Sequence, residues 1–193
     1  MKKRFGLAAA LLLGLSLLAT GSAVAEDKAN TEFDFHIGDA FLAAATGNPA
    51  NGNGDVAKAA NGDTITIQGS GEFDTKNGKA DGDGTFVHRN AAGTVLGRGT
   101  WEAKRLVSFH DAGTSTNLAF PRTFHAGEAV LLVHAVGHPA SNPDATVEFD
   151  ATLGVFCELP GAGTAEGVTF NPGFINFNTR VSGVTVFVAE DDD

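Results

Sequence analysis

The sequence contains one cysteine, Cys157, and no tyrosine among its 193 residues. A single cysteine excludes an intramolecular disulfide, so packing and hydrogen bonding must hold the fold together. Cys157 falls on an apolar position of a predicted strand, which favours a buried small hydrophobic side chain over a reactive thiol. The aromatic side chains are 15 phenylalanines and one tryptophan, Trp101.

Basic residues are also scarce. The chain has 13 lysines and arginines against 23 aspartates and glutamates, for a formal net charge of −10. A chain this acidic repels phosphate backbones and anionic lipid surfaces, which argues against nucleic acid as a partner. The acidic C-terminal residues 190–193 are expected to form a solvated tail.

The only long apolar run lies near the N-terminus, from Phe5 to Leu18. It follows three basic residues and precedes the small-residue pattern Ala23-Val24-Ala25, which together predict a secretory signal peptide over residues 1–25. Its removal takes three of the 13 basic residues and none of the 23 acidic ones, so the formal charge falls from −10 to −13. The run is shorter than the ~20 residues that span a bilayer, and no later segment approaches that length. The sequence therefore predicts a secreted or periplasmic protein with a single β domain over residues 26–189 and no membrane span.

The remaining chain has almost no helical periodicity, apart from a short candidate helix around residues 39–45. Apolar residues instead recur at every second position, which is typical of strands with one buried face. Clusters of Gly, Asn, Asp and Pro separate the candidate strands. These strands cover residues 31–37, 64–73, 80–89, 94–109, 128–137, 146–158, 168–178 and 183–189.

This pattern predicts an all-β fold, an antiparallel up-and-down β-barrel of about eight strands. A two-sheet β-sandwich is the alternative, because it uses the same alternation. The longest irregular stretch, residues 46–63, is expected to be a mobile surface loop.

Glycines occupy positions in the strands at 64–73, 80–89 and 94–109 where core side chains are expected. Short turns predict that Gly71 faces Gly82 and that Gly69 faces Gly84 in the first hairpin. In the second hairpin they predict that Gly84 faces Gly99 and that Gly82 faces Trp101. Such a glycine patch either allows tight curvature under aromatic neighbours or leaves a cavity beside Trp101.

Four residues are candidates for a ligand site. Phe86 and His88 share the inward parity of their strand, and Trp101 and Arg105 share that of the next strand. An inward guanidinium requires an anionic partner, so a bulge that turns Arg105 outward is the alternative. The candidate ligand-binding residues are thus His88, Trp101, Arg105 and Phe86.

Signatures of catalysis and metal binding are largely missing. There is no HExxH pattern and no GxSxG elbow, and no catalytic residue or cofactor is predicted. Calcium is left open at Asp81 and Asp83 in DGDGT and at Asp55 in NGNGD, although neither stretch has the glutamate that ends an EF-hand loop. Both stretches are interpreted first as turns.

The segment GTFVHRNAAGTVLGRGTWEAKRLVSF and the later EGVTF and VSGVTVFV resemble a group of small exported bacterial proteins of unassigned function. This resemblance, over residues 63–188, implies secretion and an all-β domain but no site residues. In size and meander the chain is also similar to lipocalin and allene oxide cyclase barrels, at the level of the fold only.

Three functions follow as hypotheses. The first is binding of a small apolar or amphipathic molecule, the second a structural or surface-interaction role with a filled interior, and the third a cyclase-like or isomerase-like enzyme. A cavity that reaches Trp101 would favour binding, and a filled interior would favour the structural role. Contact between His88 and a carboxylate inside an open cavity would favour the enzyme. The sequence does not determine the oligomeric state.

Overall fold

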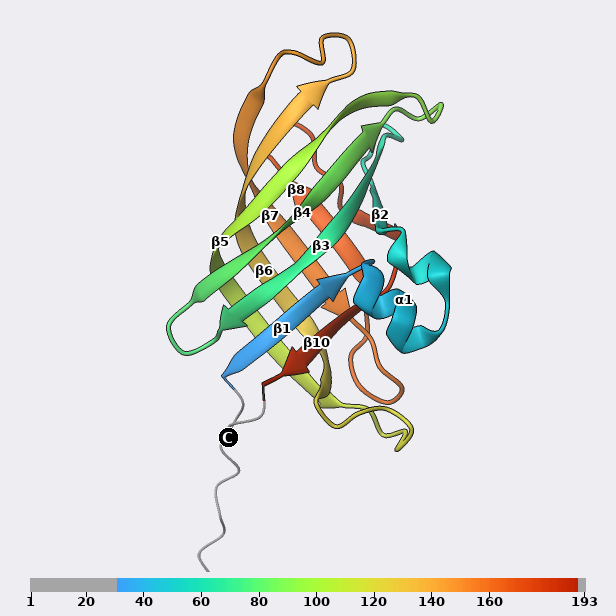
Figure 1. Ribbon diagram of the computed structural model, residues 1–193, viewed down its shortest axis with the longest axis vertical. Helices are drawn as coiled ribbons and strands as arrows, with labels where there is room; N and C mark the ends of the chain where they lie inside the picture. The colour runs from blue at the N-terminus through green and yellow to red at the C-terminus, as the bar shows by residue number, and fades with distance from the viewer. Residues whose placement is uncertain (1–30, 191–193) are drawn as a thin grey trace, which may run out of the picture.

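The computed structural model describes residues 31–190 (Figure 1). The predicted signal peptide and most of the acidic tail lie outside these residues. Within them the chain forms ten strands, one α-helix and one 3-10 helix. The elements are β1 (Glu32–Ile37), α1 (Ala40–Thr46), the 3-10 helix (Pro49–Gly52), β2 (Asp55–Lys58), β3 (Thr64–Asp74), β4 (Lys79–Arg89), β5 (Val95–Thr114), β6 (Phe124–Pro139), β7 (Val147–Cys157), β8 (Gly167–Asn171), β9 (Thr179–Ser182) and β10 (Thr185–Ala189).

The prediction of an antiparallel all-β fold is confirmed. Strands β3 to β8 form a meander in which each strand pairs with the next, and β1 pairs with both β3 and β10. Because β10 also pairs with β6, the strands β1, β10, β6, β5, β4 and β3 follow one another in a closed ring of pairings. The choice between a barrel and a two-sheet sandwich stays a prediction. No helix in residues 31–190 has the length and apolar character needed to cross a bilayer.

The long strand β6 explains why the sheet branches. On one edge His125 to Pro139 pair with β5. On the other edge Gly127 to Gly137 pair with β7, whereas Phe124 and His125 pair with β10. The strand β6 therefore takes part both in the ring and in the branch formed by β7 and β8 (Figure 1).

The stretch expected to be a surface loop is more structured than predicted. The short helix predicted around residues 39–45 precedes it as α1, which Asp39 caps by accepting a hydrogen bond from the Leu42 amide and which Gly47 ends in a left-handed conformation. The 3-10 helix and β2 follow, and β2 adds a strand between β3 and β9. The four-residue β2 has too short an alternation to be recognised from sequence.

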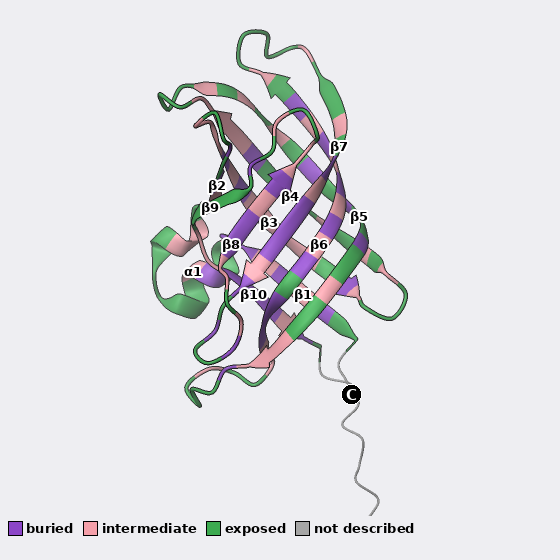
Figure 2. Cartoon of the chain, turned by 180° about the vertical axis from the view of Figure 1, so that it is seen from behind, coloured by how far each residue is buried: buried purple, intermediate pink, exposed green. Residues whose placement is uncertain are grey.

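Buried residues concentrate along the strands on the side that faces the interior (Figure 2). The alternation predicted for β1 and β7 places Phe33, Phe35 and Leu153 in this core. The largest fully buried side chain is Trp101, which stacks on Phe35 with ring centroids 6.4 Å apart.

The register predicted between β3 and β4 is confirmed, with Gly71 opposite Gly82 and Gly69 opposite Gly84. The register predicted between β4 and β5 is wrong by two residues. Gly84 faces Trp101 and Phe86 faces Gly99. One residue of the difference arises at the turn, where Arg89 pairs with Val95 and not with Thr94, and the bulge between His88 and Arg89 adds the second. A shift of two residues preserves parity, so the inward side chains are the predicted ones.

The corrected register shows what the glycines do. A Cβ atom on Gly69 or Gly84 would lie 2.4 or 2.6 Å from the Trp101 ring, and one on Gly99 would lie 2.8 Å from the Phe86 ring. Side chains at these positions would occupy the space that the two aromatic rings fill. Of the two alternatives predicted for the glycine patch, the contacts favour close packing under aromatic neighbours over a cavity beside Trp101.

Candidate functional site

An apolar pocket lies where the β4–β5 and β6–β7 hairpins approach the segment between β8 and β9. Its volume is about 160 Å³. The residues that line it are Ile65, Phe86, His88, Leu96, Gly97, Arg98, Gly137, His138, Pro139, Val147, Phe149, Phe170, Pro172, Phe174, Ile175 and Phe177.

Phenylalanine side chains form most of its wall. The Phe86 ring stacks on Phe170 with centroids 6.1 Å apart and contacts Phe149 edge-on at 6.3 Å. Phe149 in turn meets Phe174 edge-on at 5.3 Å. Edge-to-face and offset contacts of this kind hold the rings in fixed positions, so the wall is pre-formed.

The rim of this pocket exposes large apolar side chains. Leu96 is 41% exposed, Val147 46% and Phe174 70%. They come from three separate segments, β5, β7 and the loop after β8. Apolar side chains that gather around a hollow mark a surface that binds another molecule.

One polar side chain, His88, is set into this wall. It is half-buried, its Nε2 lies 3.2 Å from Asp63 Oδ2, and its ring meets Phe177 edge-on at 5.3 Å. An ionised carboxylate only accepts hydrogen bonds, so Nε2 carries the proton and donates to Asp63. In this tautomer Nδ1 is a hydrogen-bond acceptor.

The structure separates the four residues predicted to form a ligand site. Phe86 and His88 line the pocket. Trp101 is fully buried and is not among the lining residues. Arg105 is exposed, so the prediction that it points inward is wrong. The register between β5 and β6 shifts between Ala103 and Arg105, and this bulge turns the guanidinium to the outside.

Arg105→Ala is accordingly expected to leave the pocket intact. The free energy of unfolding should change by less than about 0.5 kcal/mol, as for most exposed substitutions. Urea denaturation and ligand titration of the variant check this expectation. A loss of ligand affinity would show that Arg105 reaches the pocket from outside.

Several pocket residues were not predicted from the sequence. Phe170, Phe174 and Phe177 belong to a stretch interpreted as one strand over residues 168–178. The strand ends at Asn171, and Phe170 and Phe177 are then joined by an isolated bridge. The Pro172-Gly173 pair was the available signal, because this dipeptide typically marks a turn.

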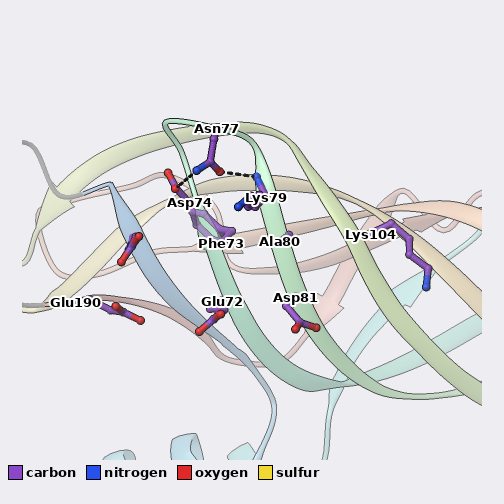
Figure 3. A pocket seen from close by; sticks show the side chains of 10 residues that line it. Glu72, Phe73, Asp74, Asn77, Lys79, Ala80, Asp81, Lys104 and Glu190 are labelled. Atoms are coloured by element: carbon purple, nitrogen blue, oxygen red, sulfur yellow. Dashed lines mark hydrogen bonds between the residues drawn. The ribbon is translucent and has the colours of Figure 1, made fainter.

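A second hollow, of about 630 Å³, is polar and open (Figure 3). It lies near the β3–β4 turn, where the Lys79 amide donates to Asn77 Oδ1 at 3.2 Å. Glu72 and Glu190 lie along its edge, and they and Asp34 can bring carboxylate oxygens within 4.8 Å of one another.

This acidic cluster raises the pKa of Glu190 through desolvation and through the charges of Asp34, Glu32 and Glu72. Divalent cations favour carboxylate oxygens. In the described residues, however, each of the three carboxylates is at least partly exposed, and no buried ligand completes the set. The cluster alone therefore does not identify a metal centre.

The two stretches considered for calcium are built differently from cation loops. Asp81 and Asp83 lie in the middle of β4, exposed on its outer face, so the interpretation of DGDGT as a turn is wrong. Asp55 is fully buried, and its Oδ1 accepts a hydrogen bond from the Val184 amide at 2.9 Å. The Asn51 side chain donates to Thr46 Oγ1 at 2.9 Å.

Asp55 belongs to a buried polar cluster that sequence reasoning missed. Desolvation raises its pKa to about 8, opposed by the Val184 hydrogen bond and assisted by the charge of Glu166. Glu166 accepts hydrogen bonds from the backbone amides of Thr185, at 2.6 Å, and Glu158, at 2.9 Å, and its pKa is also raised, chiefly by desolvation. Cys157 is buried, as predicted, and burial raises the pKa of its thiol. The Asp55 hydrogen bond joins β2 to the residue before β10, and the Glu166 hydrogen bonds join the residue before β8 to β10 and to the end of β7.

No protein-family model matches the chain, and neither the curated proteins nor the solved structures include one with significant similarity to it. The resemblance to small exported bacterial proteins therefore stays a prediction.

Proposed function

We propose that this is an exported protein that binds a small apolar or amphipathic molecule in the phenylalanine-lined pocket. The observation that carries the proposal is the coincidence of a hollow apolar wall with exposed apolar side chains at its rim. Leu96, Val147 and Phe174 each lose contact with water when a ligand covers them. Export follows from the predicted signal peptide.

The size of the pocket limits the ligand. An apolar cavity of about 150 Å³ accommodates a benzene molecule. At about 160 Å³ this pocket fits one aromatic ring or a short alkyl chain, with the remainder of the ligand at the open rim. Lipids with long chains do not fit inside it.

The interior near Trp101 supports the second hypothesis for that part of the molecule. The Trp101 ring fills the space over Gly69 and Gly84, which is the filled interior expected of a structural or surface-interaction protein. Under that hypothesis the exposed side chains at the rim contact another protein.

The contact between His88 and Asp63 is the observation that favours an enzyme of the isomerase kind. A carboxylate that accepts from Nε2 fixes the imidazole tautomer and leaves Nδ1 to take a proton from a bound molecule. This hypothesis needs the same pocket to be occupied, so ligand binding is the first property to test.

The test is a valine substitution inside the pocket. A Cβ on Gly137 would lie 3.4 Å from Phe86 Cζ and 3.7 Å from Phe149 Cε1, which are ordinary contacts. Gly137→Ala should therefore be tolerated, whereas the two γ-methyl groups of Gly137→Val should occupy ligand space. We expect the valine variant to lose at least about tenfold in affinity for toluene, measured by NMR titration of the pocket methyl groups.

Gly137→Ala is the matched control, and both variants are compared by the dispersion of their amide spectra. Undiminished toluene binding by folded Gly137→Val would place the ligand elsewhere. Absence of toluene binding by the unmodified protein would contradict the proposed function and favour the structural hypothesis.

A further inference from the structure

Only part of one edge of β7 is paired with a neighbouring strand. On that edge residues 152–156 pair with β8, whereas residues 147–151 have no strand beside them in the described part of the chain. The pairing ends because Pro172, directly after β8, has no N–H, and Gly173 turns the chain with a φ of 92°. We call residues 147–151 the open edge of β7.

The pairing of β8 shows which backbone groups face the open edge. Phe170 uses both its N–H and its C=O for hydrogen bonds to Phe177, so the residues on either side of it in β8 are the ones bonded to β7. Thr152 is therefore a bonded residue of β7, and alternation directs the N–H and C=O of Asp150 and Glu148 to the same edge. Outside the strand ladders, the backbone hydrogen bonds within residues 31–190 include none to these two residues. An added strand would satisfy these four groups.

The side chains of the open edge alternate between an apolar face and an acidic face. Phe149 lines the apolar pocket and contacts Phe174 edge-on at 5.3 Å, and Val147 is 46% exposed at the rim. Glu148 and Asp150 have the opposite parity, and their side chains are 65% and 68% exposed. A strand that pairs here would place every second side chain toward the pocket and the others beside the carboxylates.

The two carboxylates indicate the charge of the partner. In an antiparallel pair of two open edges, Glu148 and Asp150 of one chain would lie opposite the same residues of a second copy, and directly opposed like charges are unfavourable. The neighbouring His134 lies 3.0 Å from Asp150 and 3.7 Å from Glu148, and both carboxylates remain largely exposed beside it. A segment with basic side chains at the outer positions and apolar side chains at the inner positions complements both faces.

We propose that the open edge of β7 binds an extended segment of a partner protein as an added antiparallel strand, with basic side chains opposite Glu148 and Asp150 and an apolar side chain against Phe149. This inference goes beyond the proposed function, because strand addition requires the edge of β7 as well as the pocket. The antiparallel direction is that of β8, which already pairs with the same edge. In this mode of recognition main-chain hydrogen bonds supply affinity and alternate side chains supply specificity.

The experiment uses the acetylated and amidated peptide VKFKV. Its two lysines lie opposite Asp150 and Glu148 when its phenylalanine lies opposite Phe149. NMR titration at low salt compares its affinity with that of VEFEV. We expect VKFKV to bind about tenfold or more tightly than VEFEV, and the double variant Glu148→Lys/Asp150→Lys to reverse this order. Bound VKFKV should also slow hydrogen exchange of the Glu148 and Asp150 amides at least about tenfold.

Methylated peptides separate main-chain pairing from side-chain contacts. N-methylation of both lysine amides should abolish binding, because those amides face β7 in the proposed register. N-methylation of the phenylalanine amide, which faces away from β7, is the matched control and should change the affinity little. Asp81→Lys is the control for net charge, since Asp81 is exposed on the outer face of β4.

Equal affinities for VKFKV and VEFEV, or unchanged exchange of both edge amides in the peptide-bound protein, would overturn this inference. Toluene binding without peptide binding would overturn it as well and leave the proposed function standing. Peptide binding with slowed edge amides, in a protein that does not bind toluene, would support the inference and contradict the proposed function. If neither toluene nor the peptide binds, both fail.

Discussion

Replacing Asp55 with asparagine is expected to raise the free energy of unfolding at pH 8 by several kcal/mol. Asp55 is fully buried, its Oδ2 has no hydrogen-bond partner in the described structure, and burial raises its pKa to about 8. Asparagine has nearly the same shape and keeps an oxygen for the Val184 amide, but it has no proton to lose. The variant therefore removes the cost of an ionisable group at this position.

The sign of the pH dependence follows from the raised pKa. Below the ordinary aspartate pKa of 3.8 the carboxyl group is protonated in both the folded and the unfolded protein. Between that value and about 8 the unfolded chain ionises first, so the free energy of unfolding falls as pH rises. One pKa unit corresponds to about 1.4 kcal/mol, which sets an upper bound of about 6 kcal/mol on the total loss.

Urea denaturation of both proteins from pH 4 to pH 9 measures this effect. Asp55→Asn should match the unmodified protein near pH 4 and become progressively more stable than it toward pH 8. Glu166, whose pKa burial also raises, should retain its own pH dependence in the variant. Asp144→Asn is the control, because Asp144 is an exposed carboxylate in the β6–β7 loop. Parallel stability curves for Asp55→Asn and the unmodified protein would mean that water reaches Asp55 in the folded state.

Trp101→Ala is expected to lower the free energy of unfolding by about 3–5 kcal/mol, the range for large aromatic side chains in cores. The Trp101 ring is fully buried, covers Gly69 and Gly84 and stacks on Phe35. Its removal leaves a cavity over bare backbone, because neither glycine has a side chain that can move into the space. Urea denaturation followed by circular dichroism measures the loss without depending on tryptophan fluorescence.

Trp101→Phe provides the matched comparison and should cost less than the alanine change. Phenylalanine keeps a ring over the glycines and removes an indole N–H that is buried without a partner in residues 31–190. An unsatisfied buried donor is itself unfavourable, so its loss offsets part of the lost contact area. An alanine variant as stable as the unmodified protein would contradict the packing role assigned to Trp101 and its glycines.

The two effects have different origins. Trp101 stabilises the fold through contact area, which pH does not change, whereas the cost of burying Asp55 is absent below its ordinary pKa of 3.8, grows as pH rises toward about 8, and stays at its full value above that pH. Their costs should therefore be nearly additive near pH 4, where Asp55→Asn has little effect by itself. They act at separate places, Trp101 under the β3–β4 hairpin and Asp55 between β2 and β10.

Alternation in the sequence alone determined the antiparallel all-β fold, the inward parity of Phe86, His88 and Trp101, and the β3–β4 register. The reason is that the buried set of a strand repeats every two residues and a tight turn fixes which residues face each other. The burial of Cys157 followed from the same parity.

The tertiary structure alone decided the bulges and the contacts between distant segments. The β4–β5 register moved by one residue at the turn and by a second at a bulge, and another bulge turned Arg105 outward, because one extra residue costs little locally and is selected by twist and packing across the sheet. Asp55 and Val184 are 129 positions apart, and the pocket unites hairpins with the loop after β8. Such contacts depend on which strands become neighbours when the ring of pairings closes, which no local pattern encodes.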